Sequence, residues 1–211
     1  MYVTPTKNRT TYRAVLYLTD AFGLPLIENK LLADSFARAG YLTVMPDIFS
    51  GDPAPHDITF NSSEFLARHT TNATDPIVAT TIGYMRQNLG VKVLAVTGYC
   101  FGGRYAFRFG GENRGTDVVF AAHPSLLEDD EVSGVNAPAS IAAAEIDQLM
   151  LPERRLEIEN LLGESLKPFQ VSLYSGTRHG FGTRGNISNP EERFGKEEAF
   201  FQAVRWFDKW A

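Results

Sequence analysis

The sequence predicts an α/β fold, in which helices on both faces cover a mostly parallel central sheet. Short apolar runs alternate along the chain with segments of helical periodicity, as in strands joined by crossover helices. The runs are apolar at consecutive positions instead of every second one, which is typical of strands buried on both faces. No repeat or linker interrupts the alternation over 211 residues, so we expect a single domain spanning residues 1–211.

Composition argues against several classes of function. The formal net charge is −5 and no basic run is present, which argues against binding to nucleic acid or to an anionic membrane. No apolar run is long enough to span a bilayer, and the first residues carry no signal-peptide core. Cys100 is the only cysteine, so an internal disulfide is excluded and a cytoplasmic location is expected. No Cys/His group has zinc spacing, and we expect neither metal nor cofactor.

Six apolar runs are predicted to form strands. The first follows polar, turn-rich residues, so little structure is expected before residue 14. A loop rich in proline, residues 47–57, follows the second run, at the end of the sheet where ligands bind in open α/β folds. A long polar loop follows the fourth run. The runs are residues 14–19, 41–45, 93–96, 117–122, 137–144 and 168–174.

Helical periodicity and capping residues predict the helices between these runs. The first helix ends at Gly40. Residues 61–64 come close to a capping box and open a short helix, and Thr74 is predicted to cap a second helix that runs to about residue 89. Pro152 begins a helix of about ten residues, and residues 189–192 begin the last. The apolar face of that last helix is predicted to hold Phe194, Phe201, Val204, Phe207 and Trp210.

The stretch that carries chemistry is residues 98–103, Gly-Tyr-Cys-Phe-Gly-Gly. It joins an apolar strand to a helix start, and it fits the G-x-S-x-G nucleophile elbow with cysteine in place of serine. Gly98 and Gly102 leave room for the strand and the helix to pass closely. The helix N-terminus favours a thiolate at Cys100 and an oxyanion beside it. A lone cysteine is more often a buried hydrophobe, so the rest of the chain decides its role.

Two further strand ends offer the partners that a cysteine nucleophile needs, namely a base and a carboxylate that orients this base. Asp147 follows the fifth run, and His179 follows the sixth in a glycine-flanked loop. The chain order of nucleophile, acid and histidine is that of the α/β-hydrolases. Glu145 is a second candidate for the acid. We therefore predict that Cys100, Asp147 and His179 form a catalytic triad.

Other residues near these strand ends are candidates for contacting a substrate. His123 also follows a strand and is a candidate for lining the pocket. Several aromatic residues suggest a flat or apolar substrate, although ordinary core packing explains each of them equally well; they are Phe22, Phe49, Tyr99, Phe101 and Phe181. His56 and His69, by contrast, are predicted to lie on the surface.

Seven segments together make the chain similar to the dienelactone hydrolase family of α/β-hydrolases, in particular to its fungal-type members. The resemblance implies the triad of Cys100, His179 and Asp147. It also implies that an acid at the place of Asp20 helps to deprotonate the thiol, and that arginines hold a substrate carboxylate, with Arg184 as the candidate here. The segments, within residues 14–210, are TDAFGL, NKLLADSFARAGYLTVMPDIFSGDP, GYCFGGRYAFRF, AHPS, AAAEIDQLMLPE, SGTRHGF and KEEAFFQAVRWFDKW.

The chain also departs from the family pattern. Asp20 is one methylene shorter than the glutamate of the bacterial enzymes, and Arg184 does not have the bacterial spacing from His179. A carboxylate-bearing dienelactone is therefore not implied as the substrate. Family members carry a longer segment before the first run, so the N-terminal strands look trimmed here, and a homodimer would cover the exposed edge of the sheet.

We expect a cysteine-dependent hydrolase that opens a small-molecule ester or enol lactone through an acyl-enzyme. The N–H of Phe101 and an N–H of the loop at Ala21 and Phe22 are expected to hold the oxyanion. One alternative is a thioesterase, or a biosynthetic enzyme that opens or rearranges a lactone in the same pocket. Another is a catalytically silent binding protein, although a complete triad argues against it.

Overall fold

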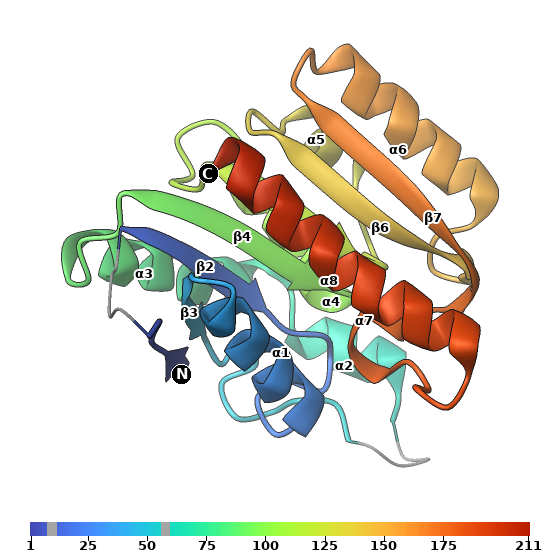
Figure 1. The fold of residues 1–211 in the computed structure, drawn as a ribbon, viewed down its shortest axis with the longest axis horizontal. Coiled ribbons are helices and arrows are strands. Elements are labelled where there is room, and N and C mark those ends of the chain that lie inside the picture. Colours follow the sequence, from blue (N-terminus) through green and yellow to red (C-terminus); the bar gives the residue numbers. More distant parts are fainter. Residues whose placement is uncertain (8–11, 56–59) are drawn as a thin grey trace.

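The computed structural model of the protein describes residues 1–7, 12–55 and 60–211. These residues form one seven-stranded sheet with the order β1-β3-β2-β4-β5-β6-β7 (Figure 1). Only β1 runs antiparallel to its neighbour, which confirms the predicted mostly parallel sheet. The strands are β1 (Tyr2–Thr4), β2 (Arg13–Leu18), β3 (Leu42–Met45), β4 (Val93–Tyr99), β5 (Val118–Ala122), β6 (Ala139–Ile146) and β7 (Phe169–Arg178).

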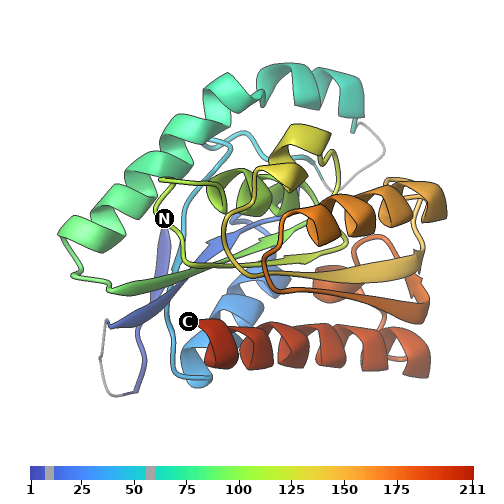
Figure 2. The same cartoon turned by 90° about the horizontal axis from the view of Figure 1, so that it is seen from above.

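Helices cover both faces of this sheet, as predicted (Figure 2). On one face, α2 to α6 pack around an apolar cluster that includes Phe107. On the other face, α1, α7 and α8 pack around a cluster that includes Phe36 and Phe207. None of the helices in the described ranges is both long and apolar enough to cross a membrane. The helices are α1 (Ile27–Arg38), α2 (Ser62–Arg68), α3 (Thr71–Gln87), α4 (Phe101–Phe109), α5 (Asp129–Ser133), α6 (Pro152–Glu164), α7 (Phe181–Arg184) and α8 (Pro190–Trp210).

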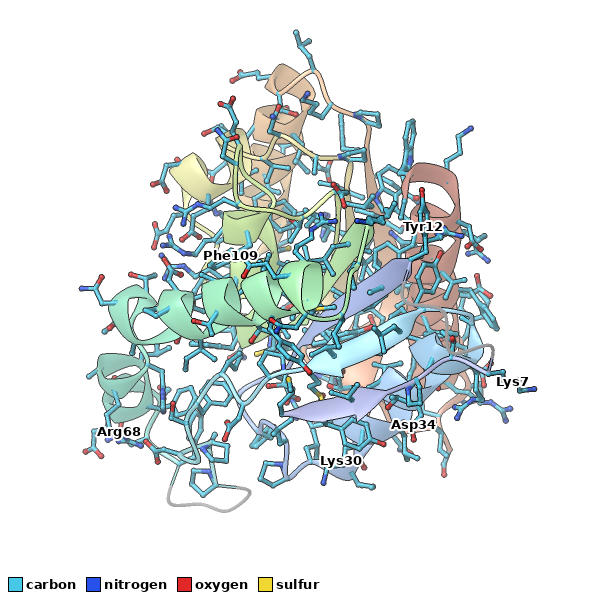
Figure 3. All side chains as sticks on the ribbon, turned by 90° about the vertical axis from the view of Figure 1, so that its left-hand side faces the viewer. Lys7, Tyr12, Lys30, Asp34, Arg68 and Phe109 are labelled. Carbon is cyan, nitrogen blue, oxygen red and sulfur yellow. The ribbon has the colours of Figure 1, made fainter. Side chains whose placement is uncertain are left out.

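The first strand shows that the expectation of little structure before residue 14 was wrong. β1 pairs antiparallel with β3 at one edge of the sheet, with Tyr2 opposite Met45. Tyr2 and Thr4 each donate a hydrogen bond of 2.8 Å to Asp34 of α1, which Figure 3 shows beside this edge. None of the three residues of β1 is fully buried. Because β1 is not buried, it has no apolar run that would predict it from the sequence. Its position depends on β3 and Asp34, which are remote in sequence.

The helix around residue 75 is capped four residues earlier than predicted. The carbonyl of Thr70 accepts the first helical hydrogen bonds, so Thr74 is not the cap. Thr74 is instead fully buried, and Asp75 forms an ion pair with α4. These tertiary contacts anchor the first turn of α3 to the rest of the protein. Pro76 is accommodated within the helix, where its missing N–H costs one backbone hydrogen bond.

The other predicted helix starts are confirmed. The side chain of Asn61 accepts hydrogen bonds from two backbone N–H groups of α2, and Asn189 does the same at the start of α8. Pro152 is the first residue of α6. The short helices α5 and α7 fall in segments that were predicted as loops. A capping box between Glu128 and Glu131 holds α5, so a local hydrogen-bond pair forms this helix without an apolar period.

The buried face of α8 differs from the predicted one. Phe207 is fully buried and Val204 packs against the core, but Phe194, Phe201 and Trp210 are 62%, 47% and 39% exposed. Small side chains and one amide face the sheet instead, because α8 packs closely against β5, β6 and β7. These buried residues are Gly195, Ala199, Gln202 and Ala203.

His69 is buried, which corrects the prediction that it lies on the surface. It is 7% exposed, and its ring centre lies 5.0 Å from that of Phe49 and 4.4 Å from that of Phe65. Its Nε2 atom lies 3.3 Å from a carboxylate oxygen of Asp52. His69 is buried because the end of α2 packs onto Phe49 and Phe65. The sequence around His69 has no apolar pattern that would predict this burial. His56 lies outside the described residues.

Candidate active site

Cys100 lies at the sharp turn between β4 and α4. Its backbone has φ 51° and ψ −113°, a positive φ that strains a residue other than glycine. Its N–H donates a hydrogen bond to the carbonyl of Ala122, and its carbonyl accepts hydrogen bonds from the N–H groups of Gly103 and Ser125. These bonds hold the strained turn in place and leave the cysteine half-buried.

Two glycines allow α4 to begin so close to the sheet. A Cβ atom at Gly98 would overlap the backbone of Gly102, and a Cβ atom at Gly102 would overlap the carbonyl of Leu18 in β2. The N–H of Gly102 donates a hydrogen bond of 3.0 Å to the carbonyl of Thr19. This close approach sets Cys100 at the N-terminus of α4, the positive end of the helix dipole.

Asp147 directly follows β6 and His179 directly follows β7, and these two strands pair side by side (Figure 1). The Nδ1 atom of His179 lies 2.9 Å from both carboxylate oxygens of Asp147. Asp147 is 6% exposed and also accepts a hydrogen bond of 2.8 Å from the N–H of Leu149. The alternative acid, Glu145, is exposed and accepts a hydrogen bond from the N–H of Gly176. Of the two carboxylates, Asp147 is therefore the one that orients the histidine.

The other ring nitrogen of His179, Nε2, is free for a thiol. It has no well-aligned hydrogen-bond partner among the described residues, and its charge interacts with the Cys100 side chain. Burial disfavours the imidazolium, but hydrogen bonding and attraction from Asp147 and Cys100 outweigh this effect and raise the pKa of His179 to about 9. The carboxylate of Asp147 therefore holds an imidazole that is protonated at neutral pH next to the elbow.

Replacing Asp147 with asparagine is expected to lower the pKa of His179, because the variant loses the carboxylate that stabilises the imidazolium. The ring protons of His179, followed by NMR against pH, should titrate near pH 9 in the wild type and at lower pH in Asp147→Asn. Since the folded pKa of about 9 exceeds the ordinary 6.5, the charged ring stabilises the fold fully below about pH 6.5. That contribution is lost as the pH rises through about 9. A wild-type titration near pH 6.5 would contradict this assignment.

Ser125 is a neighbour of the thiol that the sequence-based prediction missed. Its Oγ atom lies 3.8 Å from Cys100 Sγ, within hydrogen-bonding reach of sulfur. The available signal was its position three residues after the end of the fourth predicted strand. His123, predicted to line the pocket, is fully buried behind the site, with its ring centre 5.0 Å from that of His179. Burial, together with the positive charges of His179 and Arg184, holds the pKa of His123 well below its usual range.

Asp20 and Arg184 form an ion pair beside the elbow. Arg184 Nε lies 3.1 Å from an oxygen of the fully buried Asp20, and its guanidinium carbon lies 4.6 Å from the ring centre of Phe22. Asn29 and Thr183 donate further hydrogen bonds to the same carboxylate. These groups compensate the buried charge. The family resemblance implies a contact between Asp20 and the thiol. In the structure, the Asp20 carboxylate is instead bound by Arg184, Asn29 and Thr183.

Backbone N–H groups near the elbow are available for an oxyanion. No acceptor in the described part of the chain pairs with the N–H of Phe101, at the start of α4, or with that of Ala21. The N–H of Phe22 already donates a hydrogen bond of 3.2 Å to Asp20. The carbonyl of Ala21 accepts a hydrogen bond of 2.8 Å from Ala54, which fixes this loop. Of the predicted donors, the N–H groups of Phe101 and Ala21 are therefore the ones without an acceptor among the described residues.

Four aromatic residues predicted to contact substrate lie in the core. Tyr99 and Phe181 are each 1% exposed, Phe49 is 2% exposed and Phe101 is 3% exposed. The ring of Tyr99 stacks on that of Tyr17 with their centres 5.0 Å apart, and the ring centre of Phe49 lies 5.1 Å from that of Phe101. These rings support the walls of the site from behind, and their direct contact with substrate stays a prediction.

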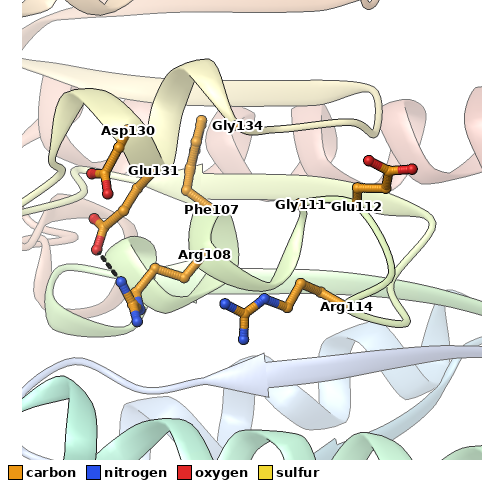
Figure 4. A pocket seen from close by; sticks show the side chains of 8 residues that line it. All are labelled: Phe107, Arg108, Gly111, Glu112, Arg114, Asp130, Glu131 and Gly134. Atoms are coloured by element: carbon orange, nitrogen blue, oxygen red, sulfur yellow. Dashed lines mark hydrogen bonds and ion pairs between the residues drawn. The ribbon is translucent and has the colours of Figure 1, made fainter.

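The candidate substrate site is a hollow of about 370 Å³ at His179. It is lined by Ile146, Gln148, Leu149, Arg178 and His179. Another hollow, of about 230 Å³, lies beside α4 and α5 (Figure 4) and shares no residue with the triad; its Arg108 is paired with Glu131 at 2.7 Å. Within the described ranges, no group of three or more His, Cys, Asp and Glu side chains is placed to hold a metal ion.

Comparison with known proteins decides the family. The family model described as "Dienelactone hydrolase family" matches residues 1–211. The chain is a member of the dienelactone hydrolase family. This hydrolase is 41% identical over 212 residues to "Hydrolase pyvD" of Aspergillus violaceofuscus and 36% identical over 220 residues to "Hydrolase tropI" of Talaromyces stipitatus. Each alignment covers 100% of this chain and 86% of the relative.

Solved structures match the fold of this dienelactone hydrolase family member. A dienelactone hydrolase-like promiscuous phosphotriesterase from metagenomic libraries gives a TM-score of 0.76 at 16% identity, covering 99% of this chain and 91% of that one. A thermophilic esterase of Thermogutta terrifontis with bound propionate gives 0.69 at 14% identity, covering 97% and 88%. At these identities the likeness establishes the fold alone, and it confirms the predicted α/β-hydrolase architecture.

Proposed function

We propose that this dienelactone hydrolase family member hydrolyses a small-molecule ester or enol lactone through a thioester on Cys100. The observation that carries the proposal is the triad geometry. A strained elbow presents the thiol, and His179, held 2.9 Å from Asp147, has a second nitrogen available for that thiol. The three residues follow three different strands, so the rigid sheet positions them and no flexible loop is required to do so.

The reaction proceeds in two steps that balance in protons. The Cys100 thiolate attacks the substrate carbonyl while His179 holds the thiol proton. His179 then gives this proton to the leaving oxygen as the carbon–oxygen bond breaks. In the second step His179 removes a proton from water, and the hydroxide attacks the thioester. The carboxylic acid leaves, and Sγ regains its starting protonation state.

Backbone N–H groups of Phe101 and Ala21 stabilise the oxyanion formed in each step. Two such donors, fixed before the reaction, lower the barrier because they need no reorganisation as the charge develops. Asp20 supports this loop through its hydrogen bond with the N–H of Phe22. Asp20 can deprotonate the thiol directly only if its carboxylate separates from Arg184. This role therefore requires that the bound substrate breaks the ion pair.

Two alternatives lead to different outcomes in the same pocket. A thioesterase, or an enzyme that opens or rearranges a lactone in a biosynthetic route, would use the same nucleophile and base. A silent binding protein has no need of a strained cysteine aligned with an oriented histidine, and such strain costs stability. The triad geometry therefore favours catalysis over binding alone, and substrate preference distinguishes the enzymatic readings.

A panel of three substrates tests the proposal. Phenyl acetate, an enol lactone such as α-angelica lactone and an acyl thioester are compared by kcat/KM. We expect turnover of the enol lactone and the aryl ester, and we expect the enol lactone to exceed the thioester. The released enol tautomerises to a ketone and makes acylation of Cys100 irreversible, whereas acyl exchange between two thiols is reversible. A dominant preference for the thioester would instead support the thioesterase reading. The absence of turnover with all three would support the binding protein.

A further inference from the structure

Two hollows next to the triad share one exposed side chain in their linings, that of Leu149. The first, of about 370 Å³, contains His179 and is walled by Ile146 and Leu149. The second hollow has a volume of about 140 Å³, and Leu149 lines both hollows. Its lining residues are Pro124, Leu126, Leu127, Leu149, Met150, Arg154 and Ile158.

Leu149 is fixed in this position by the catalytic acid. Its N–H donates a hydrogen bond of 2.8 Å to Asp147, while its side chain remains 54% exposed. Ile146 and Leu126, one in each hollow, are 45% and 37% exposed. Exposed apolar side chains grouped around a catalytic group mark a surface that binds an apolar ligand. The backbone holds the leucine in place, so its side chain can be exchanged without removing the hydrogen bond to Asp147.

The reaction chemistry assigns the first hollow to one part of the substrate. The leaving oxygen must receive its proton from Nε2 of His179, so the leaving group lies on the histidine side of the scissile bond. His179 lines the first hollow, and its Nε2 atom is buried in the free protein, so a bound ester has to reach that atom from the hollow. The second hollow is lined by Pro124, the residue before Ser125, whose Oγ atom lies 3.8 Å from Cys100 Sγ. Leu149 therefore lines both the leaving-group hollow and a further, mostly apolar space.

We propose that the hollow at His179 is a leaving-group subsite for an apolar alkyl or aryl alcohol, and that Leu149 sets the length that it accepts. The inference rests on the proposed function and adds the substrate class, namely esters and lactones whose alcohol part carries an apolar arm. Arg154, the charged member of the second hollow, is occupied by Asp129 and Glu157 at 2.6 and 3.1 Å. That space therefore suits an apolar chain better than an anion.

Two ester series test the subsite separately. Acetates of phenol and of 4-methyl-, 4-butyl- and 4-hexylphenol vary the leaving group, while the acyl group and the acidity of the phenol stay nearly constant. Phenyl acetate, butyrate and hexanoate vary the acyl group alone. Leu149→Ala and Leu149→Trp are compared with Leu151→Ala and Leu151→Trp. Leu151 is a matched control, because it has the same 54% exposure and lines neither hollow.

Leu149→Ala joins the two hollows, so kcat/KM for the 4-hexylphenyl ester, relative to phenyl acetate, should rise about tenfold over the wild type. Leu149→Trp fills the first hollow, so the relative value for the 4-butylphenyl ester should fall by about as much. The acyl series and both Leu151 variants should keep the wild-type profile. Because the two Leu149 variants shift in opposite directions, a general loss of folding cannot produce the pattern.

Three results would overturn the inference: an unchanged profile in both Leu149 variants, the same shift in the Leu151 controls, or a shift confined to the acyl series. These outcomes are distinct from failure of the proposed function, which would appear as phenyl acetate hydrolysis that survives Cys100→Ala. An enzyme that depends on Cys100 but is indifferent to Leu149 retains the proposed function and lacks the subsite.

Discussion

Cys100→Ala is expected to lower kcat/KM for phenyl acetate by at least about 10,000-fold, because no other nucleophile in the triad can replace the thiolate. The cost comes from losing a covalent step and not from losing substrate contacts, so substrate binding should persist. Stopped or initial-rate assays with the purified variant, against an enzyme-free blank, measure the loss. The backbone hydrogen bonds that hold residue 100 at its φ of 51° do not involve the side chain, so the fold should be retained.

Ser125→Ala is the control for this experiment. Ser125 Oγ lies 3.8 Å from the thiol and is a hydroxyl that could replace it as the nucleophile. We expect iodoacetamide to label Cys100 in the wild type and in Ser125→Ala, and to leave Cys100→Ala unlabelled. Substantial esterase activity in Cys100→Ala that disappears in the double variant would identify Ser125 as the nucleophile and contradict the proposal.

His179→Ala is expected to lower kcat by about 1,000-fold, within the range of 10²–10⁴ that a general acid and base contributes. The variant loses both the proton acceptor for the thiol and the proton donor for the leaving oxygen. Its activity should recover as the pH rises, because hydroxide then generates the thiolate without the histidine. The pH profile of kcat/KM in the variant and the wild type measures this difference.

Glu145→Gln provides the matched control for the acid and base assignments. Glu145 lies two residues before Asp147 but is exposed and bonded to the N–H of Gly176. We expect it to keep the wild-type rate and pH profile. A fall as large as that of His179→Ala would mean that Glu145, and not Asp147, orients the base during catalysis.

The sequence predicts the central part of this fold well, because its signals there are local. Four buried strands are continuous apolar runs, and residues 98–103 combine a strand end, two obligatory glycines and a helix start. The Asp147 and His179 positions also followed from the rule that the parallel strands end on one side of the sheet. Each of these inferences needs only the residues of one segment and general geometry.

The remaining features depend on contacts between distant segments. β1 is recognised by its pairing with β3 and by Asp34, and α3 extends to an earlier cap because Thr74 is buried. The face of α8 that packs on the sheet holds mainly glycine and alanine, because the helix lies too close to the sheet for most of its phenylalanines. The engagement of Asp20 with Arg184 joins residues 164 positions apart. No local pattern encodes such contacts.

Three other expectations stay predictions: the homodimer, the cytoplasmic location and the single-domain organisation. Phe194 and Phe201 on α8 are exposed, but their exposure does not identify a binding partner. The roles of Asp20 and Arg184 were predicted from the family resemblance and not from their sequence spacing. Asp20 forms an ion pair with Arg184, and a substrate has to break this ion pair before Asp20 can reach the thiol.

The most direct test of the central claim is to intercept the acyl-enzyme. The protein is mixed with excess phenyl acetate, quenched in acid during the first turnovers and measured by intact mass, and the adduct is then located by peptide mapping. We expect one acetyl group on the peptide that carries Cys100, removed by hydroxylamine and absent in Cys100→Ala. Turnover without any adduct, or an acetyl group on Ser125 or another residue, would contradict the thioester mechanism.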